Sequence, residues 1–491
     1  MNKKVEKMVV SCLCVFSCIV LLCMIALCFN KSTWKDEVFV FKLIQNPYSY
    51  FLLTNRDAAP PLHFIIMKFV VDICKVLVPS VNSIIVGKLV AVVPFIILVI
   101  FSFAKISKYF GWMSAAVFSF LITTMPKMFR ISIEVRMYSW VLLFATLCFF
   151  YFYVMINENS RKGVFKCTIF GALAAYTHYY ACFVIAFFCI IYLLYFITIG
   201  KKDIVKKVSV VIIGSSLLFS PWLIIAGKQV IETAENFWIP KVSIADLIDI
   251  FTYGFVADVY EREVRYAVAI VFYILLIIFI TFVIKDNMNM ISKITIFTGI
   301  LLPFAISFLG IAISLFLWPV FQARYIIPSL GCFWFAFSIV LSKIKDKHRV
   351  LFIGIIPFLM YVGYLNVNKN VKEELVYKEN MEHFQEFFNT LDGSDILFTN
   401  NYRIEYCLPM YINNEIFCWR SEEMEDWEIL LKRYLENGNV YYLDAPPESE
   451  HESTIINLPE KVQEMGYLIK DMGEFRLEYV QTEIYKIDNY G

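Results

Sequence analysis

The chain has 491 residues, of which 59% are hydrophobic, 17% aromatic and 18% charged. Soluble proteins are nearer half apolar and about a quarter charged, so this composition excludes a disordered chain, a nucleic-acid binder with a basic surface and an ordinary soluble enzyme. The net charge of +1 combines two opposite parts: residues 1–366 hold 33 Lys and Arg against 17 Asp and Glu, whereas residues 367–491 hold 11 against 26. The sequence therefore predicts a large apolar part, net +16, and a small acidic part, net −15.

The first apolar stretch runs from Met8 to Phe29 and follows Lys3, Lys4 and Lys7. About 20 apolar residues are enough to cross a bilayer, and no small-residue cleavage site follows this stretch. We interpret it as a retained signal anchor, and the positive-inside rule places its N-terminus in the cytoplasm.

Eleven further apolar runs predict about twelve transmembrane segments in all, and these must be helices because closed barrels need alternating strands. The runs lie near 61–79, 83–104, 111–129, 137–156, 164–180, 181–199, 208–226, 264–284, 291–317, 323–342 and 350–366. We therefore expect a polytopic α-helical membrane protein with about 11–13 transmembrane helices over residues 1–366.

The basic connections should face the cytoplasm. They hold Lys105 and Lys108, then residues 161–166, 201–207, 285–293 and 343–349. Residues 130–138, 178–181, 227–263, 318–324 and everything beyond 366 would then face outside. Strict alternation from the N-terminus places residues 30–60 outside, in agreement with this assignment. It also places the Lys105–Lys108 loop outside, which conflicts with the positive-inside rule. Either one early segment does not span the membrane or that loop breaks the rule.

The acidic tail, residues 367–491, predicts a small extracytoplasmic α/β domain. Ile396–Thr399 and Val440–Leu443 are short apolar runs bounded by turn residues, which is typical of strands. Residues 376–391 and 422–436 have helical spacing. Two roles remain open for this domain: a cap that shields the helices, or a domain that contacts substrate.

The first candidate site follows the first span, where residues 30–39 read NKSTWKDEVF. Asp36 or Glu37 could act as a general base on an acceptor hydroxyl, or the two together could hold a divalent metal. The spacing equally fits an ordinary helix N-terminus, where acidic side chains interact favourably with the dipole.

The second candidate site lies at residues 55–63, NRDAAPPLH. The double proline is typical of a helix start, so Asp57 is expected just outside the membrane. His63 follows near the helix start, and its pattern favours a structural histidine over a ligand.

The third candidate site combines three short segments on the expected outer side. Glu134 and Arg136 lie between two spans, and Arg324-Tyr325 lies in a second such segment. A guanidinium at this position could bind phosphate in bidentate fashion or simply extend to the interface. The segment Thr177-His178-Tyr179 completes the group.

Some signatures are absent from the sequence. No phosphate-binding glycine loop, no Rossmann pattern and no metal-binding HExxH or paired CxxC spacing occurs. No Asp-x-Asp pair occurs either, which favours a lipid-phosphate donor over a sugar nucleotide held through a metal.

In this order, the motifs WKDE, DAAPPL, EVRMY, THY and RYIIP resemble bacterial glycosyltransferase family 39, which is similar to the protein O-mannosyltransferases and the lipid A aminoarabinose transferase. These proteins share the GT-C fold, a multi-helix membrane domain with a catalytic first external loop. The motifs cover residues 30–328, and the tail is similar only in position and general character.

The resemblance implies a role for each matching position. Asp36 is then the catalytic carboxylate, Glu37 assists it, and Asp57 matches a second acidic position. The remaining matches are substrate-binding residues, namely Glu134, Arg136, Tyr138, His178, Tyr179, Arg324 and Tyr325, with Arg324 a phosphate contact. One departure is Ala59, where many members have His before the double proline, and this puts acceptor chemistry in question.

The leading hypothesis is thus a membrane glycosyltransferase that moves a sugar from a polyprenyl-phosphate donor to a glycan, lipid or protein acceptor, without a nucleic-acid partner. The expected location is the bacterial plasma membrane, with residues 1–366 forming the transferase domain and its first external loop at 30–60. The alternatives are a flippase or transporter for lipid-linked glycans, and an O-antigen-type polymerase.

Overall fold

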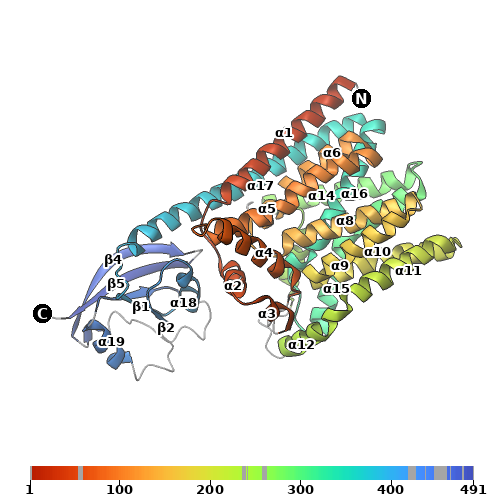
Figure 1. Cartoon of the computed structure of the whole chain (residues 1–491). Helices are drawn as coiled ribbons and strands as arrows, with labels where there is room; N and C mark the ends of the chain where they lie inside the picture. The colour runs from red at the N-terminus through yellow and green to blue at the C-terminus, as the bar shows by residue number, and fades with distance from the viewer. Residues whose placement is uncertain are drawn as a thin grey trace. The chain divides into compact units, whose positions relative to one another are not determined.

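The computed structural model in Figure 1 describes residues 3–53, 59–234, 239, 242–256, 262–418, 427–436, 438–446, 462–464, 466–477 and 480–489. The chain divides into two compact units. The first comprises Met1–Cys28 and Leu43–Val371, and the second Phe29–Lys42 and Lys372–Gly491. The second unit therefore includes a segment, residues 29–42, that we expected to belong to the membrane part.

The first unit is built from helices. Their bounds are α1 Lys3–Leu27, α3 Tyr48–Leu53, α4 Leu62–Leu77, α5 Ser83–Phe101, α6 Ser107–Thr124, α7 Met128–Ile133, α8 Tyr138–Asn157, α9 Arg161–Thr177, α10 Tyr179–Thr198, α11 Lys202–Phe219, α12 Leu223–Ala234, α13 Ile244–Thr252, α14 Arg262–Lys285, α15 Met290–Phe316 and α16 Ile327–Lys347. A π-helical turn, Ser102–Ile106, joins α5 to α6, and 3-10 turns cover Ser220–Trp222 and Ala323–Ile326. Helix α17, Arg349–Phe388, starts in this unit and ends in the second.

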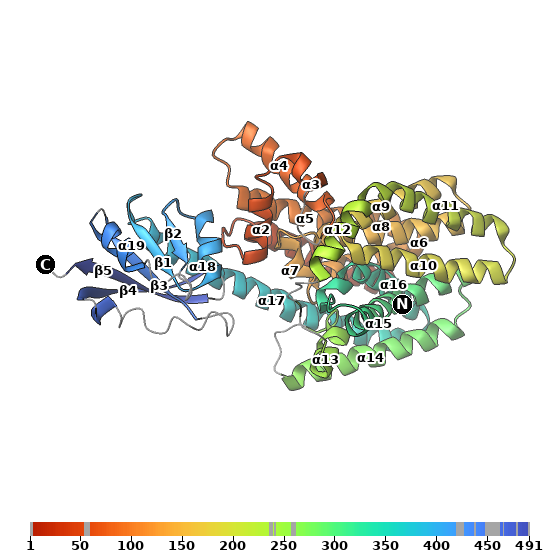
Figure 2. The same ribbon diagram turned by 90° about the horizontal axis from the view of Figure 1, so that it is seen from below.

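In the described part of the chain, nine helical stretches are long and apolar enough to cross a membrane. One of them, Ser83–Thr124, is 42 residues long and is broken inside, and α9 adds a further helix of 17 residues at the lower limit for a span. The two halves of Ser83–Thr124, the other eight stretches and α9 make eleven bundle helices in the described part of the chain. The protein is a multi-pass membrane protein. Helices α8 to α11 lie side by side in both views (Figure 1, Figure 2).

The break inside Ser83–Thr124 lies at Gly111, whose φ of 84° is in the region that favours glycine. On either side of it, Ser102 and Ser119 share a hydrogen bond of 2.5 Å between their hydroxyls, and Phe103 stacks on Trp112. The chain therefore turns back at Gly111 and forms an antiparallel hairpin, with Lys105 and Lys108 beside the turn.

Contacts at one end of the bundle resolve the conflict over the Lys105–Lys108 loop. The Tyr109 hydroxyl donates to Glu158, in the α8–α9 turn, at 2.6 Å. Lys345 binds Glu6 at 2.6 Å, and Lys347 binds Asp286 at 2.6 Å. We name this the basic end. Helix α4 has 16 residues and is not among the spanning stretches. Leaving α4 out restores strict alternation, so the early segment that does not span is the run at 61–79.

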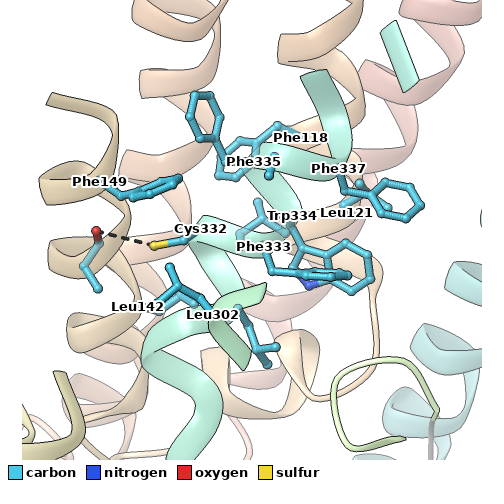
Figure 3. Packing of buried hydrophobic residues seen from close by; sticks show 14 of the residues in the cluster. Phe118, Leu121, Leu142, Phe149, Leu302, Cys332, Phe333, Trp334, Phe335 and Phe337 are labelled. Atoms are coloured by element: carbon cyan, nitrogen blue, oxygen red, sulfur yellow. Dashed lines mark hydrogen bonds between the residues drawn. The ribbon is translucent and has the colours of Figure 1, made fainter. Parts of the chain in front are cut away.

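Helix α16 forms the centre of the bundle and is buried along nearly its whole length. Figure 3 shows Phe333, Trp334, Phe335 and Phe337 projecting from it toward neighbouring helices, with Cys332 donating to the Ala145 carbonyl at 3.8 Å. Apolar side chains cover all sides of a helix when other helices surround it.

The second unit contains a five-stranded sheet in the order β2-β1-β3-β5-β4. Its strands are β1 Ile396–Thr399, β2 Ile416–Cys418, β3 Val440–Asp444, β4 Tyr467–Leu477 and β5 Val480–Asn489. Strand β1 is parallel to β2 and β3, whereas β5 is antiparallel to β3 and β4. The two expected strands are confirmed, and the hairpin of β4 and β5 was not expected.

Helices cover both faces of this sheet. Leu397, Tyr441 and Leu443 pack on one face against α17, α18 (Tyr402–Cys407) and α2 (Lys35–Leu43). Val440 and Tyr442 alternate to the other face, where α19 (Trp427–Leu435) lies. The alternation of buried side chains along a strand produces these two layers.

A close contact between α8 and α16 gives the first testable prediction. A Cβ on Gly331 would overlap the Thr146 hydroxyl, which is fixed by its own bond to the Leu142 carbonyl at 2.6 Å. We expect Gly331→Ala to lower the apparent melting temperature in detergent, because overpacking costs about 1–3 kcal/mol. Gly354→Ala is the matched control, since nothing lies within 4 Å of its Cβ position. Equal melting temperatures for the two variants would contradict this packing.

Candidate functional site

The opposite end of the bundle gathers the sequence-predicted residues of the third candidate site, and we name it the site end. Glu134 ends α7, Tyr138 starts α8, His178 lies between α9 and α10, and Arg324-Tyr325 lies in the 3-10 turn before α16. The His178 ring lies 5.8 Å from the Tyr138 ring and 5.3 Å from the Tyr325 ring, centroid to centroid. Helix packing thus joins segments almost 190 residues apart in sequence.

His178 is oriented by the start of α10. Its Nδ1 accepts the Tyr180 backbone N–H at 3.1 Å, so the neutral ring carries its proton on Nε2. Burial, with the neighbouring Arg136 and Arg324 guanidiniums, lowers the pKa of His178 to about 3. His178 is therefore a neutral hydrogen-bonding group and not a cation at physiological pH.

Glu134 is the carboxylate within this group. It pairs with Arg130 one turn earlier, Nε to Oε1, at 3.4 Å. Burial raises the pKa of Glu134, while the charges of Arg130, Arg324 and Arg136 oppose that rise. Within the part of the chain that the structure describes, three guanidiniums therefore act on this carboxylate. A group of guanidiniums of this kind suits an anionic ligand.

His63, at the start of α4, also lies at the site end. It is 1% exposed. Burial, together with the charge of Arg136, lowers the pKa of His63 to about 3, although a hydrogen bond with the Val135 backbone opposes this shift. A buried imidazole with a backbone partner is in keeping with the structural histidine that the sequence favoured.

Lys88 is a further candidate residue that sequence reasoning missed. It lies in the second turn of α5, is 3% exposed, and forms no ion pair among the residues that the structure describes. Helix α5 starts at the site end and packs against α7, which carries Arg130. A buried lysine in an apolar helix is a functional candidate by default. In the sequence, the signal for this candidate was a single lysine inside the otherwise apolar run 83–104.

Tyr179 has a different role from its neighbours. Its hydroxyl donates to Gln229 Oε1 at 2.5 Å and accepts from Trp222 Nε1 at 2.9 Å. These bonds tie α12 to the start of α10, so the Tyr179 hydroxyl is engaged in positioning a connecting segment.

Asp36 and Glu37 lie in the first turn of α2, in the second unit. Glu37 is 3% exposed, and its Oε2 accepts the Trp34 backbone N–H at 3.1 Å. This is half of a capping box, in which the third helical residue reaches back to the N-cap. Glu37 therefore caps the start of a helix, and the alternative interpretation of the motif was an ordinary helix N-terminus. Asp36 lies on the same turn and is half-buried.

Two expectations from the sequence stay predictions: a role for Asp57 and a divalent metal at Asp36 and Glu37. Asp57 lies outside the described residues. No group of three or more His, Cys, Asp or Glu side chains that could hold a metal occurs among the residues searched, which are the described ones. A divalent metal at Asp36 and Glu37 stays a prediction.

Comparisons with known proteins identify the class of fold. No protein-family model and no curated protein matches the sequence. Among solved structures, proteins with the GT-C fold match almost the whole chain.

The particular structures are those of ArnT from Cupriavidus metallidurans. The apo form matches with a TM-score of 0.56 and the form bound to undecaprenyl phosphate with 0.59, each at 9% identity over 96% of this chain and 97% of that chain. An Archaeoglobus fulgidus oligosaccharyltransferase in complex with Zn and sulfate matches with a TM-score of 0.47 at 11% identity, over 87% of this chain and 67% of that chain. The GT-C fold expected from the order of the motifs is confirmed by the ArnT structures.

The buried histidines predict a pH dependence of stability. The pKa of both His63 and His178 is about 3 in the fold, against an ordinary value of 6.5. Between these values the unfolded chain binds protons that the folded chain does not, so stability is complete above about pH 6.5 and falls as pH decreases. We expect the apparent melting temperature to fall on acidification from about pH 7 to 5, and His178→Gln to flatten this dependence. The exposed His348 supplies the control His348→Gln, and an equal flattening there would contradict the assignment.

Proposed function

We propose that the protein is a membrane glycosyltransferase that transfers a sugar from a polyprenyl-phosphate donor to a hydroxyl of a glycan, lipid or protein acceptor. The observation that carries the proposal is the gathering of three guanidiniums at the site end, where Arg130, Arg136 and Arg324 all act on Glu134. A membrane-embedded bundle that gathers guanidiniums at one end suits the phosphate of a lipid whose chain lies in the bilayer. The ArnT structure bound to undecaprenyl phosphate supports this choice of donor class.

Each residue has a separate chemical role in the proposed reaction. Arg136 and Arg324 stabilise the phosphate, whose charge increases as the bond from its oxygen to the anomeric carbon breaks. The acceptor oxygen forms the new bond to that carbon, and Asp36 takes the acceptor's proton. A single displacement of this kind inverts the configuration at the anomeric carbon. The leaving group is the polyprenyl phosphate.

His178 and Lys88 extend the binding group. His178 donates through Nε2 to a sugar hydroxyl or a phosphate oxygen. The Lys88 ammonium adds a point charge for the phosphate. Tyr138 and Tyr325 flank His178, and their rings suit contact with the apolar face of a sugar.

The proposed location is the bacterial plasma membrane, with the N-terminus cytoplasmic and both the site end and the C-terminal domain outside. The support for this orientation is the positive-inside rule. Lys105, Lys108 and Lys207 lie beside the turns at the basic end, and Lys345 and Lys347 bind acidic side chains there.

The catalytic role of Asp36 is tested by Asp36→Asn in liposomes that contain a panel of polyprenyl-phosphate sugars, with release of the lipid phosphate as the readout. We expect kcat to fall by about 10²–10⁴-fold, the range for loss of a general base. The control is Asp203→Asn, an exposed residue in the first turn of α11. Full activity of Asp36→Asn would disprove the mechanism, and movement of intact donor across the bilayer without release would favour a transporter.

The role of Lys88 is tested by binding of undecaprenyl phosphate to the purified protein. We expect Lys88→Met to raise the Kd by about tenfold or more, because a charge-assisted hydrogen bond contributes about 1.5–3 kcal/mol. The fold should tolerate the change, since methionine fills the same volume without burying a charge. Lys105→Met, at the basic end, should bind as the wild type does. An unchanged affinity for Lys88→Met would remove it from the site.

A further inference from the structure

Residues 29–42, which carry the acidic pair, fold as a part of the C-terminal domain. Val38 of α2 is fully buried and belongs to the apolar layer on one face of the sheet. Its neighbours in that layer include Phe384 of α17 and Leu397 of β1. Helix α2 therefore occupies a place in the α/β domain although more than 300 residues separate it from the rest of that domain.

Polar anchors hold this segment at its start and its end. Asn30 Nδ2 donates to the Glu374 carbonyl at 2.9 Å and to Glu374 Oε2 at 3.0 Å. Lys42 Nζ donates to the Tyr406 carbonyl at 2.7 Å and lies 3.7 Å from the centre of the Tyr406 ring. In the sequence, Asp36 lies midway between Asn30 and Lys42.

A third anchor lies three residues before Asp36. The Tyr411 hydroxyl accepts the Thr33 backbone N–H at 3.0 Å and lies 2.5 Å from the Thr33 hydroxyl. The next backbone N–H, that of Trp34, goes to Glu37. Two successive N–H groups ahead of the helix are thus satisfied by side chains, so the entry of the chain into α2 is fixed by hydrogen bonds on both sides of Trp34.

The surroundings of Tyr411 keep its hydroxyl available for these bonds. Its ring packs edge-on against Phe384, with centroids 5.4 Å apart. Burial raises the pKa of Tyr411 above its ordinary value, and the Glu37 carboxylate adds to this rise, although the bonds with Thr33 oppose it. Asn30, Thr33, Glu37 and Glu374 are each between 3% and 6% exposed. The anchors therefore work in a largely dry environment, where a hydrogen bond is electrostatically stronger than in water.

We propose that Tyr411 is a positioning residue for Asp36, so that the C-terminal domain is part of the catalytic apparatus and not only a cap. This inference rests on the proposed function, because it needs Asp36 to be the base. The physical reason is that a general base must be held within a fraction of an ångström of its reacting geometry. A nine-residue helix is marginal in isolation, so α2 needs the sheet and the Tyr411–Thr33 bonds to fix its first turn.

The test compares Tyr411→Phe with the wild type in the liposome assay. We expect kcat to fall about tenfold, while KM for the lipid donor changes by less than about twofold, because donor binding does not involve Tyr411. Thr33→Val should reproduce the loss, Thr33→Ser should largely restore kcat, and Tyr411→Phe with Thr33→Val should be no worse than either alone. A purely structural role would instead lower the yield of folded protein and leave kcat of the folded fraction unchanged.

Hydrogen exchange supplies a readout that does not depend on activity. In Tyr411→Phe, amides of residues 33–38 should exchange at least about tenfold faster, whereas those of β3 and β5 should be unchanged. The matched control is Tyr485→Phe, which removes a hydroxyl bonded to Glu483 at 2.5 Å within β5. That control should change neither kcat nor the exchange of residues 33–38.

The outcomes separate the two proposals. If the wild type transfers sugar and Asp36→Asn does not, but Tyr411→Phe keeps full kcat, the positioning role is wrong and the proposed function stands. If the wild type transfers no sugar from any donor, the proposed function fails and the positioning role fails with it. Loss of kcat together with faster exchange at residues 33–38 supports both.

Discussion

Positive charge held inside an apolar bundle is the constraint on which the rest of the structure depends. Arg136 and Lys88 are 8% and 3% exposed, and Glu134 carries the single carboxylate of the described group. Burying a charge is costly, so a fold keeps such groups only where a ligand or another constraint requires them. The same field keeps His63 and His178 neutral and leaves them as hydrogen-bonding groups. In the proposed function, these groups receive the phosphate of a lipid whose chain lies in the bilayer.

The acidic pair is held by a different part of the chain. Residues 29–42 lie on the sheet of the C-terminal domain, with Val38 in its apolar layer and Tyr411 bound to Thr33. The two halves of the proposed chemistry, phosphate binding and proton removal, thus belong to separate compact units. Neither of the two roles first considered for the tail, a shield or a substrate contact, includes this support of Asp36.

One glycine decides the topology of the bundle. Gly111 lets the stretch Ser83–Thr124 fold into a hairpin, and its turn lies with Tyr109 and Glu158 at the basic end. Helix α4 has 16 residues, carries Lys68, Asp72 and Lys75, and has His63 in its first turn at the site end, where α5 also begins, so we count no crossing for it. The hairpin and α4 together remove the conflict between alternation and the basic loops. Hydropathy left the conflict open, because the run at 61–79 is apolar enough to resemble a span.

The sequence by itself determined the fold class, the basic loops and two strands of the tail, because bilayer thickness, charge placement and strand patterns act on local composition. Tertiary structure alone decided three things: that His63 lies beside Arg136, that the Tyr179 hydroxyl binds α12, and that α2 belongs to the C-terminal domain. Each depends on contacts between segments distant in sequence, such as Thr33 with Tyr411. A pattern of residues along the chain encodes which face of a helix is apolar, but it does not encode which distant surface will cover that face.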